Sequence, residues 1–419
     1  MPPALPPTQS PTPPPPAPAS APVSPRVDPA LVVIAAGVCA ALHVGKLAPA
    51  VTTLQVELGM TLVQAGFLLS LVQGAGMLLG LVFGALADGL GARRSMVMGL
   101  ALLAAASAAG GSVAGVPALM LCRVAEGFGF LLVVLPAPGL VRALVPPARV
   151  SAMLGVWGAY MPLATALALL LGPLCISAFG WRMWWWALAA LSVLALMALR
   201  HAVPARQAGA AATPQALPWW LRLRFTLAAP GAWWVALCFA MYSGQWLAVI
   251  GFLPAIYTQA GVAAGTTGVL TALVAATNIV GNLSAGRLLQ RGVGPGKLLA
   301  TGFVAMAVAA AVAFGAAGEL ATLPPWARYA ALLCFSGFGG LIPATLFALA
   351  LRVAPGPQTA STTIGWVQQW SALGQFAGPP LVAAVASQVG GWHLTWAATG
   401  AFALAGLVFS ALLVRGLAR

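Results

Sequence analysis

Charged side chains are scarce in this 419-residue sequence. Asp, Glu, Lys and Arg together make up 6% of it, and only five residues are acidic. Soluble domains carry about 25% charged residues, so the composition excludes a large water-facing domain. Hydrophobic residues instead make up 61% of the chain. The first question is therefore how often the chain crosses a lipid bilayer.

Cysteine is also rare and indicates neither a metal site nor a disulfide framework. The five cysteines are an odd number, show no CxxC or CxxH spacing and fall inside apolar segments, where they serve as small apolar fillers. The sequence also has no Ser/His/Asp set in a loop, no metal-ligand cluster and no Walker-type loop for ATP. We therefore expect no enzyme, no cofactor and no bound metal.

Long apolar segments follow one another from residue 31 to residue 415. A membrane-spanning helix needs about 20 apolar residues, and these runs are too long and too uniform for the alternating strands of a membrane barrel. The sequence therefore predicts an all-α membrane protein with twelve transmembrane helices. The predicted spans are 30–52, 63–87, 95–113, 116–143, 151–179, 183–200, 230–258, 265–288, 297–317, 327–351, 361–386 and 393–414.

Two polar regions organise the chain. Residues 1–29 contain 13 prolines, which lack the N–H group that a helix needs, so we predict a disordered cytoplasmic tail. A docking site for a proline-recognising partner is the alternative, but no basic flank or repeated PxxP register supports it. Residues 201–226 are predicted to be a cytoplasmic linker between two six-helix bundles, 30–200 and 227–419.

The basic residues predict the orientation in the membrane. With a cytoplasmic N-terminus, fifteen of the nineteen Lys and Arg residues fall on the cytoplasmic side. Arg182 and Arg328 fall outside, and Lys46 and Arg123 lie within spans. This distribution follows the positive-inside rule, so the net charge of +14 reflects orientation and not nucleic-acid binding. We expect a monomer in the bacterial inner membrane, with the lipid bilayer around it and both termini in the cytoplasm.

The two halves of the chain resemble each other. Gly66 aligns with Gly268, 202 residues later, and Gly172-Pro173 aligns with Gly378-Pro379. A duplicated six-helix unit is typical of transporters that bind their substrate between the halves near the bilayer midplane. A channel needs a pore-lining filter segment, and the sequence shows none.

Two motifs resemble those of the major facilitator superfamily. Residues 84–94, GALADGLGARR, are similar to its G-x-L-A-D-x-x-G-x-R-R signature, although Gly89 stands where the family usually has a basic residue. Residues 121–127, LCRVAEG, resemble its fourth-helix R-x-x-x-G pattern. The resemblance covers nearly the whole chain beyond the tail. It implies the major facilitator fold and secondary active transport of a small solute by alternating access.

The resemblance also implies a gate at the loop between the second and third helices. Asp88 ends a helix in basic surroundings and needs a cation, which Arg142 or Arg149 can supply. Arg93 and Arg94 complete the predicted gating group. The alternative is that these residues only cap helices and orient the chain.

Two further patterns concern the subgroup. Residues 43–49, HVGKLAP, and 281–287, GNLSAGR, are similar to the cyanate/nitroimidazole-transporter-like subgroup. The superfamily's exporters carry a G-x8-G-x3-G-P pattern on the fifth helix. Here that pattern occurs on the eleventh, at Gly365, Gly374 and Gly378-Pro379. This displacement argues weakly against a drug–proton antiporter.

Four ionisable residues inside the spans mark the predicted substrate and proton site. Each costs about 2.5–3.5 kcal/mol on insertion scales and so marks a candidate functional position. His43 and Lys46 lie one turn apart on the first span, while Arg123 and Glu126 share a face of the fourth. With neutral His43 the four sum to +1, which favours a small organic anion held by Lys46 and Arg123. The alternative is that Arg123 and Glu126 neutralise each other while Lys46 extends to the membrane surface.

Glu126 is also the first candidate for carrying a proton, because it is the only carboxylate within a span. His43, which titrates near neutral pH, is the second. A static ion pair between Glu126 and Arg123 is the alternative. We expect proton-coupled uptake (symport) of a small organic anion, and the competing hypothesis is proton-driven export of drugs or of a metabolite such as a siderophore. A non-transporting membrane sensor is a third possibility that no signalling domain supports.

Polar and aromatic residues of four other spans complete the predicted substrate site. For each of them a helix–helix hydrogen bond is the alternative. They are Trp157, Tyr160, Tyr242, Gln245, Trp246, Asn278, Asn282, Gln368, Gln369 and Gln375.

Overall fold

The computed structural model describes residues 28–81, 91–204, 217–315, 320 and 322–417. The proline-rich tail, the loop with Asp88 and most of the predicted linker lie outside these ranges. The first half contains α1 (Pro29–Gly45), η1 (Ala48–Ala50), α2 (Val51–Leu58), α3 (Leu62–Ser70), η2 (Leu71–Gln73), α5 (Ala92–Ser112), α6 (Val116–Val134), α7 (Ala137–Leu144), α8 (Pro147–Gly158), α9 (Tyr160–Phe179) and α10 (Trp181–Ala202). The second half contains α11 (Trp219–Ala228), α12 (Pro230–Gln259), α13 (Ala264–Gln290), α14 (Pro295–Phe314), α15 (Pro325–Gly339), α16 (Leu341–Val353), η5 (Pro357–Thr359), α17 (Ala360–Val389), η6 (Trp392–Leu394) and α18 (Thr395–Leu417).

These helices match the predicted spans. Within the described residues, eleven helical segments are long and apolar enough to cross a membrane. The 30-residue α17, which contains several glutamines, serines and threonines, is the other long helix. The predicted all-α membrane fold is therefore confirmed. The predicted linker 201–226 is partly helical, because α11 begins within it.

Hydropathy did not predict that some spans are interrupted. The first span leaves the α-helix after Gly45 and resumes as η1 and α2, because Pro49 has no N–H group for the preceding turn. The second span changes to a 3₁₀ turn at η2. Such breaks release main-chain carbonyls from the helical ladder, and buried carbonyls need other partners.

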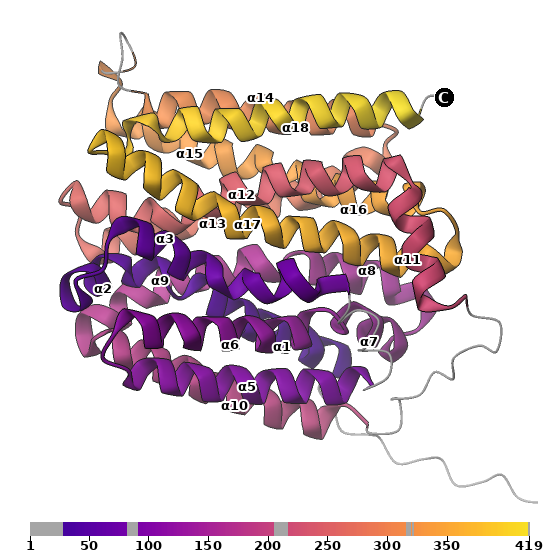
Figure 1. Cartoon of the computed structure of the whole chain (residues 1–419), viewed down its shortest axis with the longest axis horizontal. Coiled ribbons are helices and arrows are strands. Elements are labelled where there is room, and N and C mark those ends of the chain that lie inside the picture. The colour runs from indigo at the N-terminus through magenta and orange to yellow at the C-terminus, as the bar shows by residue number, and fades with distance from the viewer. Residues whose placement is uncertain (1–27, 82–90, 205–216, 316–319, 321, 418–419) are drawn as a thin grey trace, which may run out of the picture.

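The helices form two groups that lie side by side in Figure 1, with the first half below the second. In the first group α5 packs against α6 and α10, and in the second α12 packs against α17 and α18. The main contacts between the groups are those of α3 with α17 and of α9 with α13.

Glycines allow the helices to approach closely at both crossings. A Cβ atom at Gly66 would lie 2.9 Å from Cα of Pro380, and one at Gly268 would lie 3.2 Å from Cγ of Pro173. Gly66 and Gly268 are the residues that the internal repeat aligns. A Cβ atom at Gly66 would also lie 3.0 Å from the main-chain oxygen of Pro379, so each glycine faces the proline of an aligned Gly-Pro segment. The repeat in the sequence therefore corresponds to two equivalent contacts in the structure.

The two groups are in contact at the α2 end and also along the second and eleventh spans, where the Leu81 main chain bonds to Gln369. α3 begins and α17 ends on the same side of the molecule as α2, on the left of Figure 1, whereas the C-terminus lies on the right. Among the described residues, the extensive contacts between groups involve η1, α2, α3, η2 and α9, but not α7, α8, α11 or α16. The end that carries α2 is thus one place where the described parts of the two groups are packed together.

Candidate substrate and proton site

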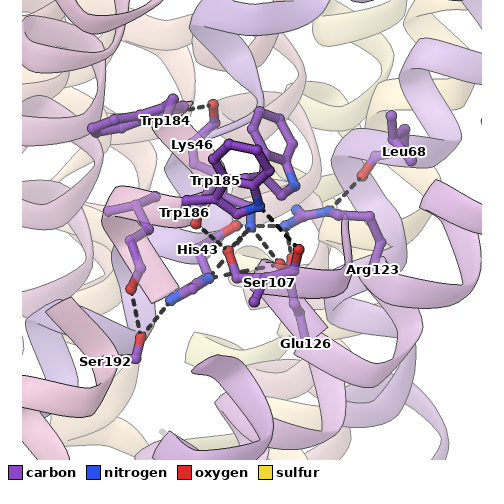
Figure 2. Close-up of polar contacts among 12 residues, drawn as sticks. His43, Lys46, Leu68, Ser107, Arg123, Glu126, Trp184, Trp185, Trp186 and Ser192 are labelled. Carbon is purple, nitrogen blue, oxygen red and sulfur yellow. Dashed lines mark hydrogen bonds and ion pairs between the residues drawn. The ribbon is translucent and has the colours of Figure 1, made fainter. Parts of the chain in front are cut away.

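A cluster of charged side chains is buried inside the first group of helices (Figure 2). His43 lies on α1, Lys46 directly follows α1, and Arg123 and Glu126 lie one turn apart on α6. All four side chains have an exposed fraction of 0%. The structure therefore brings together the four ionisable residues that the sequence placed within spans. The alternative in which Lys46 extends to the membrane surface is wrong.

Glu126 is the centre of this charged cluster and is paired through both carboxylate oxygens. Its Oε1 accepts a hydrogen bond from Lys46 Nζ, and its Oε2 accepts one from Arg123 Nη1 at 2.6 Å. Two cations thus share one carboxylate, which leaves a charge of +1 when His43 is neutral. Because an unpaired buried charge is costly, the neutral groups around the cations must stabilise this excess.

The ammonium of Lys46 has three N–H groups, and three polar atoms surround it. Besides Glu126 these are Ser107 Oγ on α5 at 2.9 Å and His43 Nδ1 at 3.5 Å. Ser107 in turn donates to the main-chain oxygen of Trp185 on α10 at 2.8 Å. The Trp185 ring lies 4.7 Å from Lys46 Nζ and adds a cation–π contact. Neither Ser107 nor Trp185 was predicted to belong to the site.

Arg123 links the breaks in two spans. Its Nη1 donates to the main-chain oxygen of His43 at 2.6 Å, and its Nε donates to that of Leu68 at 3.2 Å. These carbonyls lie just before the break after α1 and just before η2, so the guanidinium supplies donors where the helices are interrupted. Arg123 Nη2 is buried and has no hydrogen-bond partner among the described residues. Two N–H groups therefore remain for a further acceptor.

His43 connects the cluster to α10. Its Nε2 lies 2.8 Å from Ser192 Oγ, and Ser192 Oγ donates to the main-chain oxygen of Leu188 at 2.9 Å. The thiol of Cys39 lies 3.6 Å from the same hydroxyl. Ser192 is completely buried and was not predicted, since a single serine in an apolar helix gives no sequence signal.

Predicted residues of the second half form a separate, uncharged network. Asn278 Nδ2 donates to the hydroxyl of Tyr242 and to the main-chain oxygen of Ser336, both at 2.9 Å. Trp246 Nε1 donates to Ser336 Oγ at 3.2 Å, and Asn282 Nδ2 donates to Asn278 Oδ1 at 2.9 Å. These bonds join α12, α13 and α15. They are helix–helix hydrogen bonds, which were the alternative to substrate binding for these residues.

The predicted glutamines occupy different positions. Gln369 Oε1 accepts a hydrogen bond from the Leu81 main chain at 3.2 Å, and Gln73 Nε2 donates to Gln375 Oε1 at 3.0 Å. Both bonds join the second and eleventh spans, one from each half. Gln245 is buried, its amide nitrogen donates within its own helix, and its Oε1 has no partner in the described part of the chain.

Trp157 and Tyr160 lie beside the first helix. Their rings are stacked, with centroids 4.4 Å apart. A Cβ atom at Gly37 would lie 2.3 Å from the ring of Trp157, so this aromatic pair covers α1 almost two turns before His43. Neither side chain is a hydrogen-bond partner of the charged cluster within the described residues.

The predicted gating group is only partly described, because Asp88 lies outside the described residues. Arg149 pairs with Asp28 Oδ2 at 3.1 Å, a partner that was not predicted. Asp28 also caps α1 by accepting a hydrogen bond from the main chain of Ala30 at 3.0 Å. An Asp-Pro step before an apolar run is a signal for a helix start, so this cap was recognisable in the sequence.

The other predicted gating residues lie at the same end of the molecule. Arg93 Nη2 donates to the main-chain oxygen of Arg200 at 2.9 Å, which joins the start of α5 to the end of α10. Arg94 and Arg142 are exposed. Gating by this group stays a prediction.

Comparison with known proteins gives the family. The sequence model of the Major Facilitator Superfamily matches residues 33–256 and again residues 235–418. The chain therefore belongs to the Major Facilitator Superfamily. It is a membrane transporter and not an enzyme, and the fold implied by the motifs is confirmed.

Two curated relatives come from Streptomyces. The chloramphenicol resistance protein of Streptomyces lividans is 32% identical over 243 residues, which cover 56% of this chain and 60% of the relative. The tetracenomycin C resistance and export protein of Streptomyces glaucescens is 32% identical over 99 residues, or 24% of this chain and 18% of the relative. Less than two thirds of either relative is matched.

Solved structures share the fold at low sequence identity. A bacterial homologue of the human lysosomal transporter Spinster, in an inward-facing and occupied conformation, has a TM-score of 0.72 at 15% identity, with 92% of this chain and 96% of that chain covered. A D-xylose-proton symporter has a TM-score of 0.73 at 15% identity, with the same coverage of 92% and 96%. At this identity the likeness concerns the fold alone.

Proposed function

We propose that this transporter couples the uptake of a small organic anion to the movement of protons. The observation that carries the proposal is Arg123 Nη2, a buried guanidinium nitrogen without a partner in the described residues, beside a charged cluster with a net charge of +1. A substrate carboxylate would accept its two N–H groups in charge-assisted hydrogen bonds. Cyanate or another small anion suits the same donors.

Proton coupling follows from the charge of the cluster. Lys46, Arg123 and Glu126 sum to +1, and one added proton on His43 or Glu126 raises the sum to +2. Each excess positive charge is costly in a buried site, and an incoming anion offsets it. Proton binding therefore favours anion binding, and by linkage the anion favours proton binding to the same degree.

We further propose that alternating access is a rocking of the bundles 30–200 and 227–419 about the crossings of α3 with α17 and of α9 with α13. With both termini in the cytoplasm of a bacterial cell, the end that carries α2 faces outward. The gating group around Asp88 and Arg149 would then close the opposite end. The chain would act as a monomer in the inner membrane.

Proton-driven export is the second candidate. It is favoured by the names of the two Streptomyces relatives, both resistance proteins and one of them an export protein. A buried cluster that exchanges a proton serves antiport as well as symport, so the geometry is compatible with both uptake and export of the substrate.

The experiment uses the purified full-length protein in liposomes. We expect an inward proton gradient to drive the uptake of at least one of radiolabelled cyanate, lactate and succinate. Because protons enter with the anion, internal pH should fall less when the anion is absent. Lys46→Ala and Arg123→Ala should abolish this uptake. Arg224→Ala, at an exposed position of α11, is the matched control that removes a basic residue elsewhere.

Two results would contradict the uptake proposal. One is anion uptake that persists unchanged in Lys46→Ala and Arg123→Ala. The other is an absence of anion uptake together with gradient-driven efflux of chloramphenicol from preloaded liposomes, which would establish export.

A further inference from the structure

We infer that Ser192 fixes the tautomer of His43 and thereby makes His43 Nδ1 the atom that accepts the coupled proton. The inference about the proton rests on the proposed function, whereas the tautomer is a property of the protein alone. Ser192 lies on α10, at the side of His43 opposite to Lys46 and Glu126 (Figure 2).

The first step is a count of hydrogens at Ser192. Its hydroxyl has one hydrogen, and the Leu188 carbonyl, an acceptor without any hydrogen, lies 2.9 Å away. If the hydrogen pointed to His43 instead, two oxygen atoms would face each other with none between them. The hydroxyl therefore donates to Leu188 and accepts from His43 Nε2, 2.8 Å away. Nε2 consequently carries the hydrogen of the neutral ring.

The second step concerns the other ring nitrogen. Nδ1 lies 3.5 Å from Lys46 Nζ, which is a donor only. A hydrogen on Nδ1 would face the N–H groups of the ammonium, whereas a lone pair accepts one of them. Both sides of the ring thus select the same tautomer, with hydrogen on Nε2 and a lone pair on Nδ1.

The third step is the consequence of adding a proton. The proton binds the lone pair of Nδ1 and displaces the hydrogen bond from Lys46. No covalent bond in the protein breaks, and the Nε2–H bond to Ser192 is kept. The new Nδ1–H group lies 3.7 Å from Glu126 Oε1, the oxygen that Lys46 holds in the unprotonated state. The imidazolium then competes with Lys46 for this oxygen. Lys46 becomes free to contact an anion.

Few other charged or titratable groups surround His43 in the described part of the chain. On the same span these are Cys39 and Lys46, and on α6 they are Arg123 and Glu126. The elements α5 and α10 contribute the hydroxyls of Ser107 and Ser192 and the indole of Trp185 to the described cluster. Lys46 and Glu126 are therefore the charged partners between which a proton on Nδ1 acts.

The test is nitrogen NMR of the full-length protein with ¹⁵N-labelled histidine, in which His43→Gln identifies the signals of His43. Two-bond correlations to the ring protons assign the hydrogen to Nε2 or Nδ1. We expect the Nε2–H form to dominate in the wild type near neutral pH. Ser192→Ala should reduce its excess over the other form roughly fivefold, the factor that corresponds to one hydrogen bond of about 1 kcal/mol.

Two variants separate tautomer control from simple packing. Ser192→Thr keeps the hydroxyl and should retain the Nε2–H form. Ser107→Ala, which removes a hydroxyl bonded to Lys46 and not to His43, should also retain it. In proton-driven uptake, Ser192→Ala should shift the pH profile and Ser192→Thr should restore it.

The outcomes distinguish this inference from the proposed function. A wild-type His43 with its hydrogen on Nδ1, or an unchanged tautomer in Ser192→Ala, would overturn the inference whatever the protein transports. The Nε2–H form in a protein that moves no anion would leave the tautomer assignment intact and refute the proposed function. If Ser192→Ala does not fold, the wild-type spectrum still decides the assignment.

Discussion

The guanidinium of Arg123 donates a hydrogen bond to the main-chain oxygen of His43 at 2.6 Å. A side chain of the fourth span thereby contacts the first span at the turn where its helix ends. The same guanidinium contacts Glu126 at 2.6 Å. A change in the charge of Glu126 therefore acts directly on the guanidinium that also bonds to the end of the interrupted helix.

Arg123 should be essential for stability as well as for transport. Arg123→Ala leaves Glu126 Oε2 and two buried carbonyls without their donor, and breaking a buried ion pair costs about 3–5 kcal/mol. Arg123→Lys keeps the charge but lacks the forked geometry that reaches His43 and Leu68 together, so it should recover only part of the loss. Thermal unfolding in detergent measures both effects. Equal stability of Arg123→Lys and the wild type would contradict this role of the fork.

Lys46 and Glu126 should behave as a coupled pair. Glu126→Gln removes the only carboxylate of the cluster and leaves Lys46 and Arg123 as adjacent buried cations, so it should destabilise the protein strongly. Lys46→Met in the same chain removes one of these cations and should restore part of the stability. A double-mutant cycle measured by thermal unfolding should give a coupling energy of about 1–3 kcal/mol. Additive effects would show that the two residues act independently.

The charged cluster was predictable from the sequence because ionisable residues are rare in an apolar chain. His43, Lys46, Arg123 and Glu126 each stand out in a span, and their helical spacing placed them in pairs. Ser107 and Ser192 do not stand out, because serine is tolerated anywhere in a membrane helix. A helix that is apolar all round also gives no periodicity to show which face is turned inward.

The interruptions of the first and second spans were not predicted from the sequence. Hydropathy gives the length of an apolar run but not its internal geometry, so the runs 30–52 and 63–87 were read as continuous helices. Pro49 is a local signal for the first break. The 3₁₀ turn at η2 contains no proline or glycine, and it depends on tertiary contacts such as the bond from Arg123 to Leu68. A local sequence pattern does not reveal such tertiary contacts.

The pair Asp28 and Arg149 should contribute modestly to stability. Their side chains are 26% and 55% exposed, and exposed ion pairs are worth roughly 0–1 kcal/mol because water and salt screen them. Asp28→Asn keeps the cap of α1 and loses only the ion pair, whereas Asp28→Ala also loses the cap, worth about 1 kcal/mol. Asp28→Ala should therefore unfold at a lower temperature than Asp28→Asn. The reverse order would contradict the capping role.

The crossings of Gly66 with Pro380 and of Gly268 with Pro173 should control the conformational equilibrium. A leucine at either glycine would collide with the facing helix, since even a Cβ atom would lie 2.9 Å from Cα of Pro380 or 3.2 Å from Cγ of Pro173. Gly66→Leu and Gly268→Leu should each push the two halves apart at the α2 end. They should shift the protein toward the state that is open there.

Spin labels can measure this shift in a cysteine-free background. Labels at Val56→Cys on α2 and Ala260→Cys after α12, both exposed positions, report the distance between the halves at the α2 end. Gly66→Leu and Gly268→Leu should lengthen it by a similar amount, because the repeat makes the two crossings equivalent. Gly400→Leu is the matched control, since nothing lies within 4 Å of a Cβ atom at that glycine. An unchanged distance in both crossing variants would show that these contacts do not hold this end closed.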